Sequence, residues 1–249
     1  MNDEKPYLSV IIPAYNEEKR ISKTLLAIDQ YLAKQSYNYE ILVVSDGSKD
    51  KTGDVVAGFQ KMIRNLKLID NKENHGKGWV VRQAMLQAKG EFRLFTDADN
   101  STSIDHIEKA WPLLKSGYDI VIGTRDSRDH KDARQAVSQS VFKRTLANMG
   151  NILIQLLAVW GIWDTQCGFK VFSAKAAEDI FKRCVIDRWG FDIEALAIGR
   201  RLGYKISVIP VNWINDAESK VDLKGYIKTF IELFQIKINL ITNKYGIKK

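Results

Sequence analysis

Phe95-Thr96-Asp97-Ala98-Asp99 is the stretch around which the other parts of this sequence can be interpreted. Residues 91–95 are expected to form a buried strand that runs directly into two aspartates. Parallel strands bind ligands at their carboxyl ends, and residues at i and i+2 on an extended chain point the same way. Asp97 and Asp99 therefore offer hard oxygen ligands to Mg²⁺ or Mn²⁺. The alternative is an Asx-type turn with a helix cap at residues 100–101.

Length and charge limit the possible classes of protein. The 249 residues suit one large α/β domain, alone or with a C-terminal extension. The formal net charge is +8, and seven lysines follow from position 220 onward against two acids. Such a basic tail suits nucleic acid, an anionic membrane surface or phosphate-bearing substrates. Two cysteines indicate a reducing compartment, the three histidines lack metal-ligand spacing, and the first residues contain no secretion signal.

Short apolar runs alternate with helical patterns through the first half of the chain. Strands are expected over 8–14, 41–44, 66–69, 91–95 and 119–123, with helices between them. A short strand ending near 172, helices over 173–182 and up to 202, and a strand over 205–210 follow. Alternation of this kind predicts an α/β fold with a doubly wound, mostly parallel sheet and flanking helices.

The loops that follow the expected strands carry different polar groups. Asp46 could accept a hydrogen bond from a nucleobase or ribose, or it could cap the next helix. Gly76-Lys77-Gly78 would let the backbone approach a phosphate, with Lys77 to neutralise it. It matches neither the phosphate loop of NTPases nor the dinucleotide fingerprint. Arg125 begins a polar stretch to Arg134 that is either a solvated loop or a basic flap over phosphates.

Two apolar stretches raise the question of a membrane. Residues 145–163 are uncharged, but polar residues at Asn148, Asn151 and Gln155 favour an amphipathic helix on a membrane or on the sheet over a membrane span. Residues 223–241 form a basic amphipathic helix, either docked on the domain or anchored at a membrane surface.

Three acids in the second half are candidate bases: Asp164, Asp192 and Glu194. Each could equally be a helix cap or a solvated acid, and the last two precede a helical run whose N-terminus favours negative charge.

Taken together, the motifs resemble the family 2 inverting glycosyltransferases, which have the GT-A fold. The residues that carry the resemblance are 10–17 (VIIPAYNE), 44–52 (VSDGSKDKT), 74–78 (NHGKG) and 97–99 (DAD). Residues 164–170 (DTQCGFK), 188–194 (RWGFDIE) and 209–213 (IPVNW) resemble in addition the dolichyl-phosphate β-glucosyltransferases and related polyprenyl-phosphate sugar synthases. The motifs extend over residues 8–221, which we expect to be the catalytic domain, with 222–249 as its basic helical extension.

The resemblance implies a role for each matching residue. Asp97 and Asp99 would hold Mg²⁺ or Mn²⁺ on the donor diphosphate, and Asp46 would meet uracil. Asp164 would lie where the family's proposed base lies. Further residues expected at the nucleotide sugar are Pro13, Ala14, Tyr15, Glu17, Lys77, Ala98 and Arg125. Those expected at the acceptor or its phosphate are Arg134, Gln166, Trp189 and Lys220. Mannose-synthase relatives often have a metal-binding Gln where this chain has Ser101, which leaves the third protein ligand open.

The expected activity is therefore transfer of a hexose from a nucleotide sugar, most simply glucose from UDP-glucose, to a polyprenyl or dolichyl phosphate with inversion. The alternatives are mannose transfer from GDP-mannose, and a family 2 transferase with a soluble or glycan acceptor. Nucleotidyltransferases carry a G-x-G-T-R-like loop after the first strand, which this chain lacks, and no nucleic-acid module is recognisable. We expect a protein bound peripherally to the cytoplasmic face of a membrane through its amphipathic helices.

Overall fold

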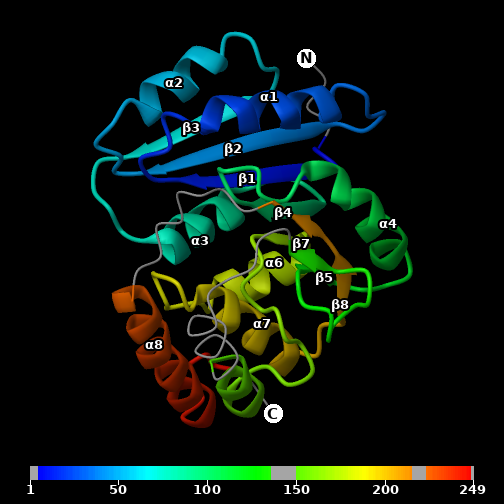
Figure 1. Ribbon diagram of the computed structural model, residues 1–249, viewed down its shortest axis with the longest axis vertical. Helices are drawn as coiled ribbons and strands as arrows, with labels where there is room; N and C mark the ends of the chain where they lie inside the picture. The colour runs from blue at the N-terminus through cyan, green and yellow to red at the C-terminus, as the bar shows by residue number, and fades with distance from the viewer. Residues whose placement is uncertain (1–4, 136–149, 215–222, 248–249) are drawn as a thin grey trace.

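The computed structural model describes residues 5–135, 150–214 and 223–247. Within them a twisted seven-stranded sheet runs through the centre of the molecule (Figure 1). Its strands, in spatial order, are β3 (Leu66–Asn71), β2 (Tyr39–Asp46), β1 (Leu8–Ala14), β4 (Phe92–Thr96), β7 (Phe169–Ser173), β5 (Ile120–Thr124) and β8 (Ile206–Pro210). The predicted α/β class and mostly parallel sheet are confirmed.

Only β7 breaks the parallel order among these strands. It pairs antiparallel with both β4 and β5, and its first residue, Phe169, lies opposite Thr96 at the end of β4. This insertion brings residues just before β7 to the carboxyl end of β4. A separate two-stranded ladder pairs β6 (Arg134–Gln135) with β9 (Asn212–Trp213) in parallel.

Helices cover both faces of the sheet, so the strands are apolar on both sides. Alternate residues of β1 show this: Val10 and Ile12 pack in one core and Ile11 in the other. The first core lies under α1 (Ile21–Leu32), α2 (Thr52–Phe59), the 3₁₀ turn η1 (Ile104–His106) and α4 (Ile107–Lys115). The second lies under α3 (Lys77–Gln87), α6 (Ala174–Phe181) and α7 (Phe191–Arg201).

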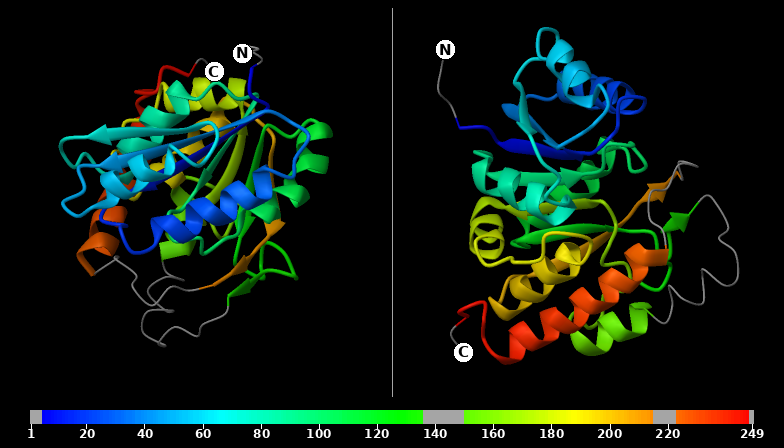
Figure 2. Two further views of the ribbon diagram at one scale, coloured as in Figure 1. Left: turned by 90° about the horizontal axis from the view of Figure 1, so that it is seen from above. Right: turned by 90° about the vertical axis from the view of Figure 1, so that its left-hand side faces the viewer.

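Two further helices lie outside α7. One is α8 (Leu223–Ile241), which buries Leu233 and Ile236, and the other covers residues 150–157. They run side by side in Figure 2, and a Cβ on Gly150 would lie 3.6 Å from the Phe230 ring. In the described part of the chain, none of the helices combines the length and apolar character needed to cross a membrane.

The expected pattern of the 145–163 stretch is wrong in two respects. The helix ends at residue 157, and Gly161 turns the chain with a φ of 77°. Gln155, expected on a polar face, is buried, because its amide accepts from the Gly161 N–H and donates to the Ile162 carbonyl. The exposed row is apolar instead, with Ile152, Leu156 and Trp160.

Candidate active site

The polar side chains of the candidate site lie where the strand order of the sheet reverses. From β1 the strand order runs outward through β2 and β3 in one direction and begins with β4 in the other. The strand order therefore reverses between β1 and β4, and open α/β sheets bind ligands at such a switch point. Asp46 is the last residue of β2, and Asp97 follows β4 directly. The sequence predicted this grouping, because the carboxyl ends of parallel strands share one edge.

Asp97 is enclosed by a lysine on one side and a glycine on the other. The Lys77 ammonium lies 2.7 Å from Asp97 Oδ1, over the rings of Phe95 and Trp189. Burial alone would lower the pKa of Lys77, but the charges of Asp97 and Asp192 raise it, so the side chain is a permanent cation. Gly168 lies so close that a Cβ there would be 1.9 Å from Asp97 Oδ2.

Asp99 forms the Asx-type turn considered as the alternative to a metal site. Its Oδ1 accepts from the Ser101 N–H at 2.9 Å, and Asn100 between them has a φ of 55°. Ser101 is buried, and its carbonyl accepts from the Ile214 N–H at 3.0 Å. The turn uses one lone pair of one oxygen, so Asp99 Oδ2 keeps its capacity as a cation ligand.

The two aspartates fit a divalent cation bound mainly through its substrate. Among the described residues, no three His, Cys, Asp or Glu side chains gather around one point. Mg²⁺ and Mn²⁺ nevertheless bind nucleotides through one or two carboxylates, with phosphate oxygens and water completing the shell. The hard oxygens of Asp97 and Asp99 provide such a pair, and Gly168 leaves the room that the Asp97 carboxylate needs.

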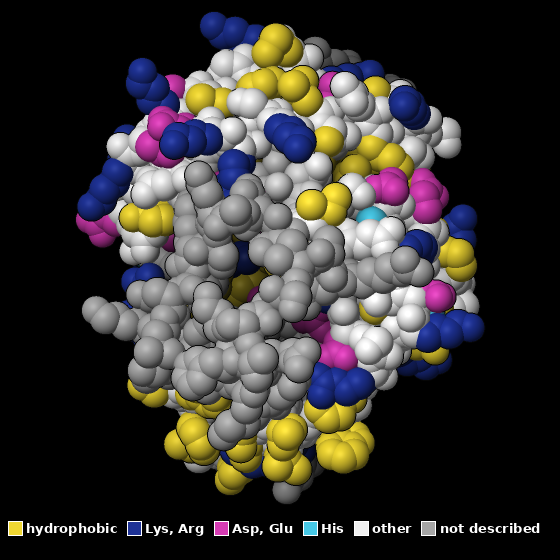
Figure 3. Space-filling view, viewed as in Figure 1, with side chains coloured by type: hydrophobic (Ala, Val, Ile, Leu, Met, Phe, Trp, Pro, Cys, Tyr) yellow, Lys and Arg dark blue, Asp and Glu magenta, His cyan; other side chains and the backbone are white. Residues whose placement is uncertain are grey.

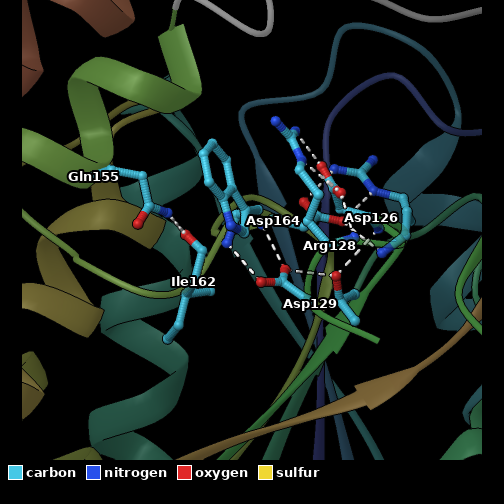
Figure 4. Close-up of polar contacts among 9 residues, drawn as sticks. Asp126, Arg128, Asp129, Gln155, Ile162 and Asp164 are labelled. Atoms are coloured by element: carbon cyan, nitrogen blue, oxygen red, sulfur yellow. Dashed lines mark hydrogen bonds and ion pairs between the residues drawn. The ribbon is translucent and has the colours of Figure 1, made fainter. Parts of the chain in front are cut away.

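Asp164 is fully engaged with Arg125. Its Oδ2 accepts from the Arg125 backbone N–H at 2.8 Å and from Nε at 2.7 Å, and its Oδ1 accepts from Nη2 at 2.8 Å (Figure 4). Burial raises the pKa of the Asp164 carboxyl, but the Arg125 guanidinium outweighs burial and holds it below its usual value. Arg125 also lies 5.3 Å from the centre of the Trp213 ring. The pair therefore presents a rigid guanidinium rather than a free base.

A second buried ion pair was not found by sequence reasoning. The Lys170 ammonium, from β7, lies 2.5 Å from Asp192 Oδ1 at the start of α7 and donates to the Cys167 carbonyl. Burial raises the pKa of Asp192 although Lys170 and Lys77 oppose that shift. A lysine between Phe169 and Val171 in an apolar strand was the available signal, because buried lysines are nearly always paired.

Asp46 and Glu17 have internal partners. Asp46 accepts from the His75 and Gly76 N–H groups and from the Asn74 amide, at 2.8–2.9 Å, so it holds the loop before α3 and does not cap the next helix. The Glu17 carboxylate accepts from Nε and Nη2 of Arg20, both at 2.7 Å. These contacts fix the walls of the predicted nucleotide site.

Comparison with known proteins decides the family. Residues 9–181 match the family described as glycosyl transferase family 2, which is more than half of the chain. The chain belongs to glycosyl transferase family 2.

Relatives of this glycosyltransferase cover nearly its whole length. It is 39% identical over 242 residues to a dolichyl-phosphate beta-glucosyltransferase (ALG5A) of Trichomonas vaginalis, covering 93% of this chain and 73% of that one. It is 33% identical to the dolichyl-phosphate beta-glucosyltransferase of Homo sapiens, covering 97% and 78%. The mannosyltransferase PcManGT of Pyrobaculum calidifontis, solved with GDP-Man and Mn²⁺, shares the fold with a TM-score of 0.59 at 19% identity, covering 97% and 65%.

The glycosyltransferase's other predicted site residues lie in several environments. Pro13 and Ala14 are buried in β1, Ala98 is buried between the two aspartates, and Tyr15 is half-buried. Gln166 is exposed, and Trp189 is half-buried over Lys77. Arg134 is placed only through its backbone in β6, and Lys220 lies outside the described residues.

Glu194, the third candidate base, has a structural role. It is fully buried and accepts from the Val185 and Ile186 N–H groups and from the Tyr245 hydroxyl. Burial raises its pKa. The side chain ties the end of the chain to α7, and its oxygens are used in doing so.

Proposed function

We propose that this glycosyltransferase moves glucose from UDP-glucose to a polyprenyl phosphate such as dolichyl phosphate, with inversion, at a membrane surface. The observation that carries the proposal is the rigid Arg125–Asp164 pair, held by three hydrogen bonds and close enough to Asp97 for that charge to affect the pKa of Arg125. A fixed guanidinium beside a metal-binding pair suits an acceptor that is itself a phosphate. The names of the relatives support the same donor sugar and acceptor.

The donor side of the site would handle the leaving diphosphate. When bound, Mg²⁺ or Mn²⁺ on Asp97 and Asp99 would offset the negative charge that builds on the diphosphate. Lys77 adds a second permanent positive charge next to Asp97, in a position fixed by Phe95 and Trp189. Charges held in place before the reaction are the most effective, because they need no reorganisation as the bond breaks.

The acceptor side needs no strong base. An oxygen of the acceptor phosphate, already anionic, would form the bond to the anomeric carbon while the bond to the donor's β-phosphate oxygen breaks. UDP then leaves with that electron pair, and the α-linked donor gives a β-linked product. The lowered pKa of Asp164 makes it a poor proton acceptor, so we assign it the role of orienting Arg125.

An exposed apolar surface supports the membrane part of the proposal. We call it the apolar face; its described members are Ile152, Leu156, Trp160, Ile231, Phe234, Ile238 and Ile241. These side chains come from α8, from the adjacent helix over residues 150–157 and, for Trp160, from the turn after that helix; hydrophobic side chains gather at the lower edge of the molecule in Figure 3. On α8, Lys228 and Lys237 flank the apolar row, the arrangement of a helix lying on an anionic membrane. We place the protein peripherally on the cytoplasmic face of such a membrane.

Replacing Phe234 and Ile238 together by Glu is expected to weaken vesicle binding by about tenfold or more, since each loses apolar burial and gains repulsion from anionic lipid. Co-sedimentation with phosphatidylcholine–phosphatidylserine vesicles measures this. Met62→Glu is the matched control, because Met62 is 71% exposed but lies after α2, away from the apolar face. Equal binding by the double variant and the control would contradict the assignment of this surface.

The activity itself is tested with labelled UDP-glucose and GDP-mannose, each with Mg²⁺ or Mn²⁺, and with or without polyprenyl phosphate. We expect a labelled lipid product from UDP-glucose that depends on both the metal and the polyprenyl phosphate. Transfer from GDP-mannose at an equal rate would overturn the donor assignment. Transfer to a soluble glycan in place of the lipid would overturn the acceptor assignment.

A further inference from the structure

Asp129 lies in the loop after β5 and uses both carboxylate oxygens to hold the backbone of the Asp164 segment. Its Oδ1 accepts from the Trp163 N–H at 2.7 Å, and its Oδ2 accepts from the Asp164 N–H at 2.8 Å (Figure 4). The Thr124 hydroxyl donates to the same Oδ2 at 2.8 Å. No motif in the sequence distinguishes Asp129 from the other acids of this polar loop.

The residues held by Asp129 belong to a segment that side chains restrain at four consecutive positions. Gln155 bonds to the backbone of Gly161 and Ile162, and Asp129 bonds to the backbone of the next two residues. Charge-assisted hydrogen bonds are the strong ones, so the carboxylate contributes the firmer part of this restraint. Segment 161–164 thus reaches the site in a fixed conformation.

Fixing this backbone fixes the orientation of Arg125. The backbone N–H of Asp164 donates to Asp129, which fixes the Asp164 backbone. The Asp164 carboxylate in turn accepts from three nitrogens of Arg125. The hydroxyl of Thr124, the residue before Arg125, also donates a hydrogen bond to Asp129. Both sides of the Arg125–Asp164 pair are therefore held by the same carboxylate.

We propose that Asp129 is a positioning residue, which orients the Arg125 guanidinium toward the acceptor phosphate through its hydrogen bonds with the Asp164 backbone N–H and the Thr124 hydroxyl. This inference rests on the proposed function, because it assigns to Arg125 the contact with an anionic acceptor. Asp129 itself touches neither substrate.

The chemistry of the contact provides a sharp test. Each oxygen of Asp129 faces a backbone N–H donor, so both must be acceptors. In Asp129→Asn the amide has the same shape, but one of its two ends is an NH₂ group that meets an N–H. The substitution therefore breaks the restraint without changing the volume of the side chain. Asp119→Asn is the matched control, since Asp119 also accepts from a backbone N–H, that of Lys205, near the opposite end of β5.

The experiment compares the two variants with the unchanged protein in steady-state transfer from UDP-glucose to a short-chain prenyl phosphate. For Asp129→Asn we expect the KM for the prenyl phosphate to rise and kcat to fall, so that kcat/KM drops about tenfold or more. The Kd and stoichiometry of UDP, measured by calorimetry, should stay unchanged, which shows that the active fraction is intact. Amide hydrogen exchange should accelerate in the peptide covering 161–166.

Each other outcome has a definite meaning. Acceptor kinetics of Asp129→Asn within twofold of the Asp119→Asn control would overturn the inference, as would equal losses of UDP binding and transfer. If Asp129→Asn does not fold, Thr124→Val is the second test, because it removes one of the three donors to Asp129. It should weaken acceptor kinetics in the same way but less, with unchanged UDP binding. Unchanged acceptor kinetics in Thr124→Val would also overturn the inference. If the protein without substitutions transfers no glucose to prenyl phosphates, the proposed function is refuted. Amide hydrogen exchange of the peptide covering 161–166 would still show whether Asp129 restrains this segment.

Discussion

Asp99→Ala is expected to lower kcat/KM for transfer from UDP-glucose by about a thousandfold, because the substitution removes one of the two carboxylates that would hold the divalent cation on the diphosphate. The fold should survive. Asp99 makes only a local turn with Ser101, and the neighbouring Ala98 carbonyl is held separately by the Thr24 hydroxyl at 2.6 Å. Stability should fall by about 1 kcal/mol, the usual net contribution of one hydrogen bond.

Three measurements check this result: steady-state kinetics, Mn²⁺ binding by electron paramagnetic resonance in the presence of UDP, and thermal unfolding. Asp105→Ala is the control, since Asp105 is an exposed acid six residues further along whose carboxylate accepts from Ser103. The control should keep both activity and Mn²⁺ binding. Metal-dependent transfer at an undiminished rate in Asp99→Ala would rule out the metal assignment.

Gly168→Ala should have an effect almost as large, although Gly168 carries no chemical group. The added Cβ would lie 1.9 Å from Asp97 Oδ2 and 2.3 Å from its Cγ, so the carboxylate must move. The Asp97 N–H donates to the Gly168 carbonyl at 3.3 Å, which keeps the two backbones together. The Asp97 side chain would therefore have to rotate to relieve the clash. Rotation would turn Asp97 away from Lys77 and from the cation. We expect kcat/KM to fall by about a hundredfold or more.

The matched control for this prediction is Gly58→Ala. Gly58 lies in α2, and apart from its chain neighbours and the backbone of its own helix no atom lies within 4 Å of an added Cβ, so alanine there should stabilise the helix by about 0.5–1 kcal/mol and leave transfer unchanged. Mn²⁺ binding and kcat/KM separate the two variants. Normal Mn²⁺ affinity in Gly168→Ala would mean that Asp97 tolerates the methyl group and that Gly168 has no part in shaping the site.

The two predictions belong to one network of charges. Lys77 pairs with Asp97, Lys170 with Asp192, and Arg125 with Asp164. Lys170 and Asp192 are both buried, whereas the other two pairs are partly exposed, and in each pair the cation fixes the position of one acid. These ion pairs explain how several negatively charged carboxylates can lie close together near the place where an anionic diphosphate would bind.

The sequence by itself determined the α/β class, the seven strands of the central sheet and the sheet edge at which the candidate site lies, but not the short strands β6 and β9. Strands reveal themselves because both faces are buried and their residues are continuously apolar, as in β1. Asp46 and Asp97 could be grouped because one ends a parallel strand and the other directly follows one, whatever the spatial order of those strands. The apolar periodicity of residues 223–241 predicted a helix, and α8 has these bounds, whereas its amphipathic character stays a prediction.

Only the tertiary structure decided which side chains face each other across segments far apart in the chain. The antiparallel insertion of β7 between β4 and β5 brings Gly168 against Asp97, and no local pattern around either residue specifies it. The same holds for Asp129 and Asp164, which are 35 positions apart and joined through the backbone N–H of Asp164, a group that every residue except proline carries. Sequence patterns record burial and local conformation, whereas these contacts depend on how whole strands are ordered in space.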